Sequence, residues 1–252
     1  MYSLIKPLFF ALNPELAHNI GIFLIKNGAF NLYRTEVDKK LSINIANINF
    51  PSPVGLAAGF DKNAEVFNEM FKIGFGFIES GTVTPRPQFG NPKPRIFRLK
   101  DDFALINRLG FNNVGLNSFV SNIIEKKSSK TLCKLGANLG PNKDSENRIR
   151  DYIEGIRMVS KIVDYITINI SSPNTPGLRD FEGNDISELL KEIQINRINK
   201  IPIFIKISPD LENSDIAFII EQLIKYGLDG VIISNTTKSR DFIFKSKKIN
   251  TD

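Results

Sequence analysis

A cluster of uncharged hydrogen-bonding side chains follows a short apolar run in the middle of the sequence. The run "YITINI" is typical of a buried strand, and "SSPNTPGL" follows it with two prolines that a continuing strand would not tolerate. The cluster consists of Asn169, Ser171, Ser172 and Asn174. These are four uncharged hydrogen-bonding groups within six residues, more than the end of a buried strand needs. Serines that cap the next helix or turn are one reading of the pattern.

Serine is a poor base or nucleophile at neutral pH and needs help from its surroundings. The sequence has one histidine, His18, far from the cluster, so a Ser-His-Asp triad would have to recruit it. A single histidine and a single cysteine, Cys133, also exclude a multi-histidine zinc site, a cysteine-cluster metal site and an intrachain disulfide. We therefore expect no metal, and we expect any serine that acts as a base or nucleophile to lack a histidine helper.

The composition is that of a globular protein with one large domain. With 252 residues, 42% hydrophobic and 24% charged, the chain can bury a sizeable core. The net charge of +6 could favour nucleic acid, anionic lipid or acidic small molecules. Because no arginine-rich tract or aromatic-basic motif accompanies that charge, we expect no nucleic-acid partner. No apolar run reaches the ~20 residues that span a bilayer.

From residue 53 onward, apolar strand patterns alternate with helical patterns. Strands are predicted at 54–58, 77–80, 132–137, 165–170, 203–207 and 230–233. Helices are predicted at 64–72, 116–127, 146–162, 186–195 and 214–226. Alternating β and α units imply a parallel sheet with right-handed crossovers. The fold class is therefore α/β, as a (β/α)8 barrel or a doubly wound sheet.

The strand ends favour the barrel. Nearly every predicted strand ends in polar or small residues, as in "AAGFDK", "ESGTVTP", "GANLG", "NISSPN", "KISPD" and "SNTT". A barrel delivers such residues from every strand to one face, whereas a doubly wound sheet concentrates them at one switch point. Neither a G-x-G-x-x-G nor a Walker A motif is present. Only "FIF" at 242–244 resembles a seventh strand, so we expect an incomplete barrel of about six units.

Two further regions stand out beside the barrel pattern. The connection from Thr82 to Val114 is long and proline-rich, which is typical of a lid over a binding site. Before the barrel, Asn13 and Pro14 predict a helix start, and an apolar stripe follows. We divide the chain into a helical region, 1–40, and a barrel, 41–252. The stripe could pack on the barrel or lie in a membrane interface.

Long stretches of the sequence resemble the class 2 dihydroorotate dehydrogenases, in order from about Tyr2 to Thr237. The stretches are "GLAAGFDKN", "GTVTPRPQFGNPKPRIFRL", "INRLGFNNVG", "NISSPNTPGLR", "KISPDL" and "SNTT". The resemblance implies a (β/α)8 TIM barrel that carries FMN behind a small helical domain. It also implies oxidation of (S)-dihydroorotate to orotate, with a quinone as electron acceptor, in de novo pyrimidine biosynthesis.

The resemblance assigns roles to individual residues. The soluble class of the family uses a cysteine as its base, and Ser172 stands at that position here, so Ser172 is implied as the catalytic base. Substrate contacts are implied for Lys62, Asn107, Arg108, Leu109, Gly110, Phe111, Asn169, Asn174, Asn235 and Thr236. Flavin contacts are implied for Ala58, Gly59, Phe60, Asp61, Lys62, Thr82, Asn138, Asn169, Lys206 and Ser234, the last where the family usually has threonine.

The resemblance also implies where electrons leave the protein. His18 and Arg98 match residues of a tunnel that leads a quinone from the bilayer to the flavin. The N-terminal helices would form that tunnel, which implies a peripheral protein on the cytoplasmic face of a bacterial inner membrane. For His18, a packing role on the helix surface is the alternative.

The sequence departs from the family pattern at its end. The family continues with a glycine-rich "GGLSG"-like loop and two more βα units, which hold the FMN phosphate, whereas this sequence stops at Asp252. We therefore expect the barrel to lack its C-terminal part. Two other readings stay open at this point: a non-catalytic remnant of the enzyme, and another FMN-barrel oxidoreductase that acts on a pyrimidine. The latter would be expected to use a cysteine acid, for which Cys133 is misplaced.

Overall fold

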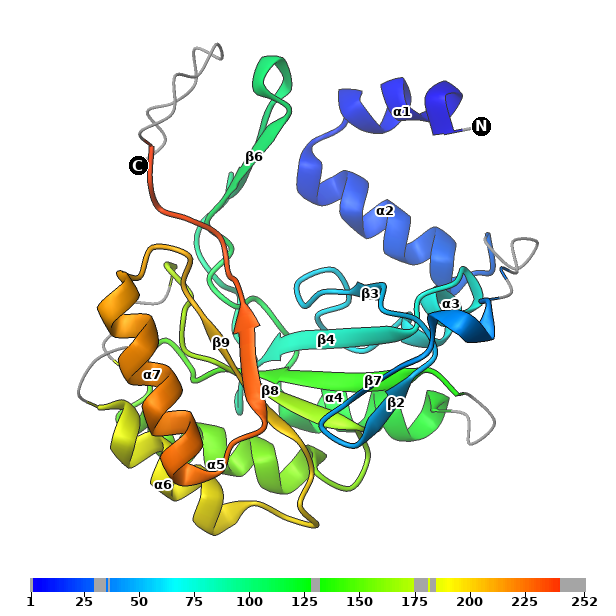
Figure 1. Cartoon of the computed structure of the whole chain (residues 1–252). Coiled ribbons are helices and arrows are strands. Elements are labelled where there is room, and N and C mark those ends of the chain that lie inside the picture. The colour runs from blue at the N-terminus through cyan, green and yellow to red at the C-terminus, as the bar shows by residue number, and fades with distance from the viewer. Residues whose placement is uncertain are drawn as a thin grey trace.

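Six parallel strands form a curled, open sheet at the centre of the molecule (Figure 1). A computed structural model describes residues 2–29, 35, 37–127, 132–174, 181 and 185–240. The strand order is β10-β9-β8-β7-β4-β3. The strands are β3 (Gly55–Leu56), β4 (Phe77–Val83), β7 (Lys134–Leu139), β8 (Tyr165–Asn169), β9 (Ile203–Ile207) and β10 (Gly230–Ile233). This arrangement confirms the predicted incomplete (β/α) barrel; the predicted strand at 242–244 lies outside the described residues.

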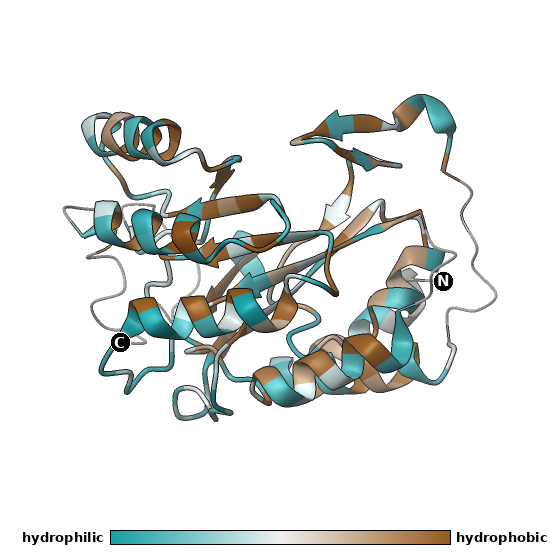
Figure 2. Ribbon diagram, turned by 90° about the horizontal axis from the view of Figure 1, so that it is seen from below, coloured by the Kyte–Doolittle hydropathy of each residue, from teal (hydrophilic) through white to brown (hydrophobic). Residues whose placement is uncertain are grey.

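Helices cover the outer face of the sheet. They are α3 (Phe67–Lys72), α4 (Leu116–Lys126), α5 (Arg148–Val159), α6 (Ile186–Asn196) and α7 (Asn213–Tyr226). All five predicted helices are present within three residues of their expected ends. Of these, α3 begins at Phe67 and not at Ala64, because Ala64 takes a left-handed backbone conformation with φ of 56°. Figure 2 shows hydrophobic and hydrophilic stretches alternating along these helices, as expected when one face packs on the core.

Alternation along the strands separates an apolar outer face from a more polar interior. On β8, Ile166 and Ile168 are fully buried in the core beneath the helices, whereas Thr167 hydrogen-bonds Glu79 of β4 inside the sheet. Side chains of successive strand residues point to opposite faces, so one run supplies both surfaces. The interior of the curled sheet can therefore hold polar groups without breaking the outer core.

A hairpin that the sequence reading missed closes the amino-terminal end of the barrel. It consists of β1 (Ile43–Ile45) and β2 (Ile48–Phe50), after the 3₁₀ turn η1 (Lys39–Leu41). The Phe50 ring packs edge-on against Phe77 and Tyr165, with centroids 5.2 and 6.1 Å apart, and Tyr165 packs against Phe204 at 5.7 Å. This aromatic layer fills the lower end of the sheet and leaves the carboxyl ends of the strands as the side on which a ligand can bind.

The N-terminal residues form α1 (Tyr2–Ala11) and α2 (Pro14–Lys26), which stand above the sheet on the side of β3 (Figure 1). As predicted, Asn13 caps α2, accepting the Glu15 backbone N–H at 2.9 Å. The apolar stripe is divided between two environments. Ala17 and Ile25 are buried against the barrel, whereas Phe23 is 64% exposed. None of the helices in the described ranges is both long and apolar enough to span a bilayer.

The long connection after β4 contains a second hairpin, of β5 (Ile96–Leu99) and β6 (Ala104–Asn107), joined by the 3₁₀ turn η2 (Lys100–Asp102). The hairpin rises beside α1 and α2 in Figure 1. Arg98 fastens the two parts together, because its guanidinium donates to the Leu12 carbonyl at 2.9 Å and lies over the Phe10 ring at 4.8 Å. The predicted lid therefore has its own strand structure.

The close approach of β7 and β8 gives a first prediction. A Cβ built on Gly136 would lie 2.1 Å from the Tyr165 ring, whereas one on Gly21 of α2 would meet nothing within 4 Å. Replacing Gly136 with alanine should lower the free energy of unfolding by about 1–3 kcal/mol through overpacking. Gly21→Ala should raise it by up to about 1 kcal/mol, since alanine favours helix. Urea denaturation measures both, and equal effects would contradict the packing described.

Candidate functional site

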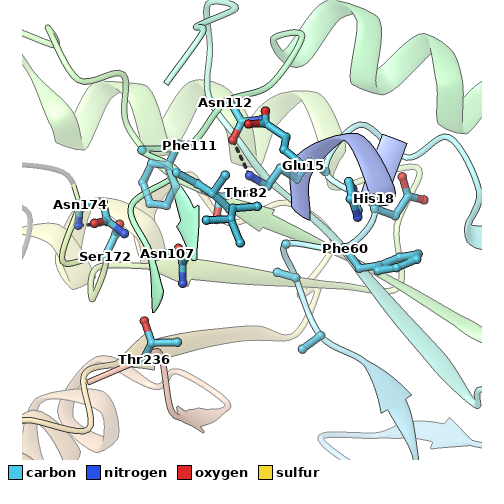
Figure 3. A pocket seen from close by; sticks show the side chains of 18 of the residues that line it. Glu15, His18, Phe60, Thr82, Asn107, Phe111, Asn112, Ser172, Asn174 and Thr236 are labelled. Carbon is cyan, nitrogen blue, oxygen red and sulfur yellow. Dashed lines mark hydrogen bonds between the residues drawn. The ribbon is translucent and has the colours of Figure 1, made fainter. Parts of the chain in front are cut away.

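A cavity of about 890 Å³ opens at the carboxyl ends of the strands, between the sheet, α2 and the long connection. In Figure 3, side chains from these three parts point into the same space. Most of the predicted site residues line it: His18, Ala58, Gly59, Phe60, Asp61, Lys62, Thr82, Arg98, Asn107, Leu109, Gly110, Phe111, Asn169, Ser172, Asn174, Lys206, Ser234, Asn235 and Thr236. Arg108 and Asn138 do not line it.

The floor of the cavity is a network of short polar side chains at the strand ends. Thr82, directly after the core of β4, donates to Asn138 Oδ1 at 2.6 Å. Asn169, the last residue of β8, donates through Nδ2 to Thr82 Oγ1 at 3.0 Å. Asn138 is fully buried and lies one layer below the ligand surface. It can therefore act on a ligand only through Thr82 and Asn169.

Lys206 on β9 lies beside Asn169 in the sheet register and lines the same cavity. It is 9% exposed, and it makes no hydrogen bond or ion pair with any residue that the structure describes. A largely buried ammonium without a partner is costly unless a ligand supplies one. The floor therefore combines uncharged amides with one cation that is available to an anionic or electron-rich group.

The loop after β3 contributes one buried acid, Asp61, and one partly buried base, Lys62. The Asp61 carboxylate accepts the backbone N–H groups of Glu65 at 2.7 Å and Val66 at 3.0 Å, which fixes the loop; burial raises its pKa to about 6. The Lys62 ammonium donates to Asn112 Oδ1 at 2.5 Å. Burial, and then the charge of Arg95, lowers the pKa of Lys62 to about 8. Lys62 still carries its charge at neutral pH and can bind a carboxylate.

The segment after β6 forms the wall opposite the floor. Asn107 and Phe111 point into the cavity in Figure 3. Gly110 takes φ of 70°, and a Cβ there would lie 2.9 Å from Asn91, so the turn requires glycine. Arg108 points away: its guanidinium donates to the Pro94 carbonyl and stacks over Phe97 at 5.4 Å. Arg108 therefore supports the hairpin from outside the cavity.

Ser172 follows β8, is 4% exposed and lines the cavity together with Asn107. Its Oγ accepts the Asn174 backbone N–H at 3.3 Å, so the turn-capping interpretation of this serine holds in part. His18 lies on the other side of the view in Figure 3, and no hydrogen bond joins the two within the described residues. Ser172 is thus a buried hydroxyl that faces the cavity without a histidine.

The third side of the cavity comes from α2. The His18 ring packs edge-on against Phe60 with centroids 5.2 Å apart, and burial, followed by the charge of Lys62, lowers the pKa of this histidine. Below it, Glu15 accepts from the Arg95 guanidinium in a bidentate pair at 2.5 and 3.1 Å. Their side chains are 14% and 5% exposed. This pair fixes α2 to the long connection.

Sequence reasoning missed several residues of the site. Asn112 belongs to the quoted "NRLGFNN" motif, so its clustering with Asn107 was a signal. Glu79 is an acid inside an apolar strand, a pattern that points to a buried polar network. Glu15 and Arg95 are 80 residues apart in the sequence, and no local pattern indicates that they form a pair. No cluster of three metal-ligating side chains occurs among the described residues.

Comparison with known proteins gives consistent matches over most of the chain. The family model for dihydroorotate dehydrogenase matches residues 40–252. A protein of Chelativorans sp. named dihydroorotate dehydrogenase (quinone) is 45% identical over 94% of this chain and 67% of its own length. One of Bartonella tribocorum with the same name is 47% identical over 96% of this chain and 69% of its own length. The crystal structure of DHODH from Eimeria tenella with ferulenol superposes with a TM-score of 0.87 at 40% identity, covering 93% of this chain and 70% of that one.

The buried pair between α2 and the barrel gives a second prediction. Replacing Glu15 with glutamine leaves the Arg95 charge uncompensated and should lower the free energy of unfolding by about 2 kcal/mol. The matched control is Asp144→Asn, which breaks the Arg86–Asp144 pair whose side chains are 63% and 73% exposed. That change should cost about 0.5 kcal/mol or less. Urea denaturation compares the two, and equal losses would contradict an anchoring role for Glu15.

Proposed function

The chain belongs to the dihydroorotate dehydrogenase family, and we propose that it oxidises (S)-dihydroorotate to orotate, passing the electrons through FMN to a quinone. The observation that carries this proposal is the convergence of a partly buried lysine, four asparagines and a serine on one cavity. They are Lys62, Asn107, Asn169, Asn174, Asn235 and Ser172. This set matches the chemistry of a planar ring that carries one carboxylate and several amide edges.

The residues present fit a flavin. Gly59, with φ of 109° and open space where a Cβ would stand, allows a flat ring to approach the backbone after β3. Lys206, which has no partner among the described residues, supplies a positive charge where a reduced, anionic flavin would need one. FMN, when bound, supplies the hydride-accepting chemistry that no side chain has. Residues proposed to hold it are Ala58, Gly59, Phe60, Asp61, Lys62, Thr82, Asn169, Lys206 and Ser234, with Asn138 supporting from below.

The proposed substrate contacts follow from charge and hydrogen-bonding capacity. The Lys62 ammonium binds the substrate carboxylate, and Asn112 holds that ammonium in place. Asn107 and Asn169 come from opposite walls of the cavity and read the amide edges of the ring between them. Because a bound ring would cover these amides, a ring without matching groups would leave them unpaired, which costs affinity. Asn174, Asn235 and Thr236 complete the polar rim.

Ser172 is the proposed base: its Oγ takes the proton from the carbon next to the ring carbonyl. The Asn174 backbone N–H, which donates to Oγ at 3.3 Å, stabilises the charge that develops on the oxygen. With no histidine in contact, the proton leaves through water or a threonine hydroxyl. The cavity wall of Leu109 and Phe111 excludes bulk water from the other side of the ring.

A quinone would approach from the side of α2. That side has an apolar lining of Ile22, Phe23, Phe60 and Leu105, and Arg98 and His18 are among its polar groups. Because burial lowers the pKa of His18, the ring there is neutral at physiological pH. The exposed apolar side chains of Leu8, Leu16 and Phe23 suit contact with a membrane surface. We propose peripheral attachment through the helical region 1–40 as the route by which a lipid-soluble quinone enters.

The proposed base gives a third prediction, which also tests the function. Mixed anaerobically with dihydroorotate, the FMN-loaded chain should bleach its flavin absorbance and form orotate. Ser172→Ala should slow that bleaching by about 10²- to 10⁴-fold, the usual contribution of a general base. Ser172→Cys, which restores a proton acceptor, should recover part of the rate. If the unchanged protein does not reduce its flavin, the proposed function is wrong. If Ser172→Ala bleaches the flavin at the unchanged rate, Ser172 is not the base.

The lowered pKa of Lys62 gives a fourth prediction. Below pH 8 the ammonium is charged and pairs with the orotate carboxylate; above it the charge is lost. The dissociation constant of orotate should therefore be flat near pH 7 and rise by up to about tenfold per pH unit above about 8. In Lys62→Met, binding should be weaker and independent of pH between 7 and 9. Fluorescence titration measures the dissociation constant of orotate for both proteins. If this constant does not change with pH in the unchanged protein, the assignment of Lys62 is wrong.

A further inference from the structure

We infer that Glu79, a buried acid outside the cavity, is a positioning residue that sets the direction of the hydrogen bonds in the cavity floor. Glu79 lies on β4, inside the curled sheet, and is 5% exposed. Its Oε1 accepts from Asn138 Nδ2 at 2.7 Å, and its Oε2 accepts from Thr167 Oγ1 at 2.9 Å and the Tyr165 hydroxyl at 3.5 Å. It forms no ion pair with any residue in the described ranges. The inference deepens the proposed function, because it concerns the amides of that same site.

The hydrogen bonds of Glu79 are those of an acceptor. Its Oε1 accepts from the Asn138 amide, and its Oε2 accepts from the Thr167 hydroxyl. Burial, followed by the Glu79 charge, raises the pKa of Tyr165 well above its usual value, so that hydroxyl stays a donor. An ionised carboxylate can accept but cannot donate.

That restriction passes from residue to residue up to the cavity. Because Glu79 only accepts, Asn138 must turn its NH₂ group downward and its Oδ1 upward. The upward Oδ1 accepts the Thr82 hydroxyl proton at 2.6 Å, so Thr82 Oγ1 is left as an acceptor. Asn169 therefore turns its NH₂ group toward Thr82, at 3.0 Å. Reversing any one of these side chains would place two acceptors or two donors against each other.

At the top of the chain this direction fixes the orientation of the Asn169 amide. Its NH₂ group donates down to Thr82, and its Oδ1 accepts the Ser171 N–H at 3.3 Å, the Ser171 hydroxyl at 3.2 Å and Asn235 Nδ2 at 3.5 Å. Asn169 therefore presents one fixed orientation to the cavity that it lines. Glu79 would set that orientation through Asn138 and Thr82.

The inference is tested by reversing the chain of hydrogen bonds as a whole. Aspartate at position 169 cannot donate to Thr82, so Asn169→Asp alone should strongly destabilise the protein. Glu79→Gln supplies an NH₂ group that can donate to a reversed Asn138. In the double variant every hydrogen bond of the chain can run in the opposite direction. The glutamine Nε2 donates to Asn138 Oδ1, Asn138 Nδ2 donates to Thr82 Oγ1, and the Thr82 hydroxyl donates to the new aspartate.

We expect Glu79→Gln to rescue Asn169→Asp. Stability is measured by urea denaturation of the full chain without added ligand at pH 7. The folding equilibrium constant of the double variant should be about ten times or more larger than the value expected if the two single effects simply added, which corresponds to about 1.4 kcal/mol. If Asn169→Asp alone does not fold, recovery of a folded double variant is the same result. Additive effects, or a double variant worse than Asn169→Asp, would overturn the inference.

Two controls separate this mechanism from its alternatives. Ser80→Ala changes the neighbouring residue on β4, whose buried hydroxyl has no hydrogen-bond partner among the described residues, and should not rescue Asn169→Asp. In an Asn138→Ala background the coupling between positions 79 and 169 should fall below about twofold, because the connecting amide is gone. Coupling that survives there would mean direct charge repulsion and would also overturn the inference. No flavin or substrate is needed, so this outcome is independent of the test of the proposed function.

Discussion

The cavity floor depends on one chain of hydrogen bonds that runs from a buried carboxylate up to the ligand surface. Glu79, Asn138, Thr82 and Asn169 come from three neighbouring strands, and parallel pairing brings their ends together. Below this chain, the aromatic layer around Tyr165 closes the barrel. Above it lies the cavity of about 890 Å³. The curled sheet thus has an apolar lower half, a polar middle and an open upper end.

The remaining walls are attached to this floor by charged groups. Lys62 is held by Asn112 from the long connection, and Arg95 of the same connection is held by Glu15 from α2. Three segments that are distant in sequence therefore meet around one partly buried lysine. Desolvation lowers the pKa of Lys62, and Glu15 opposes that shift. The N-terminal helix consequently influences the charge available to a substrate as well as the shape of the entrance.

Much of the fold could be predicted from the sequence because its strands are buried on both faces. All six parallel strands and the polar character of their ends were predicted, since long apolar runs and abrupt polar stops are strong signals. The two hairpins were not. The strands of "INIANINF" are three residues long and interrupted by asparagines, and β5 and β6 lie inside a proline-rich connection. Their pairing is set by contacts with the barrel, which local sequence does not report.

The site could be predicted in part because many of its residues lie at the ends of the predicted strands. Residues at strand ends, such as Lys206 and Asn169, line the cavity as expected, because parallel topology decides their position. Arg108 and Asn138 lie elsewhere, since a side chain within a correct segment can still point outward or downward. Glu79 and Glu15 were missed because their partners are 59 and 80 residues away.

A crystal structure of the chain with FMN and orotate tests the central claim most directly. The account predicts the orotate carboxylate at the Lys62 ammonium, the ring between Asn107 and Asn169 against the flavin, and Ser172 Oγ facing the ring carbon. Orotate bound outside this cavity, or in it with Ser172 turned away from the ring, would contradict the account.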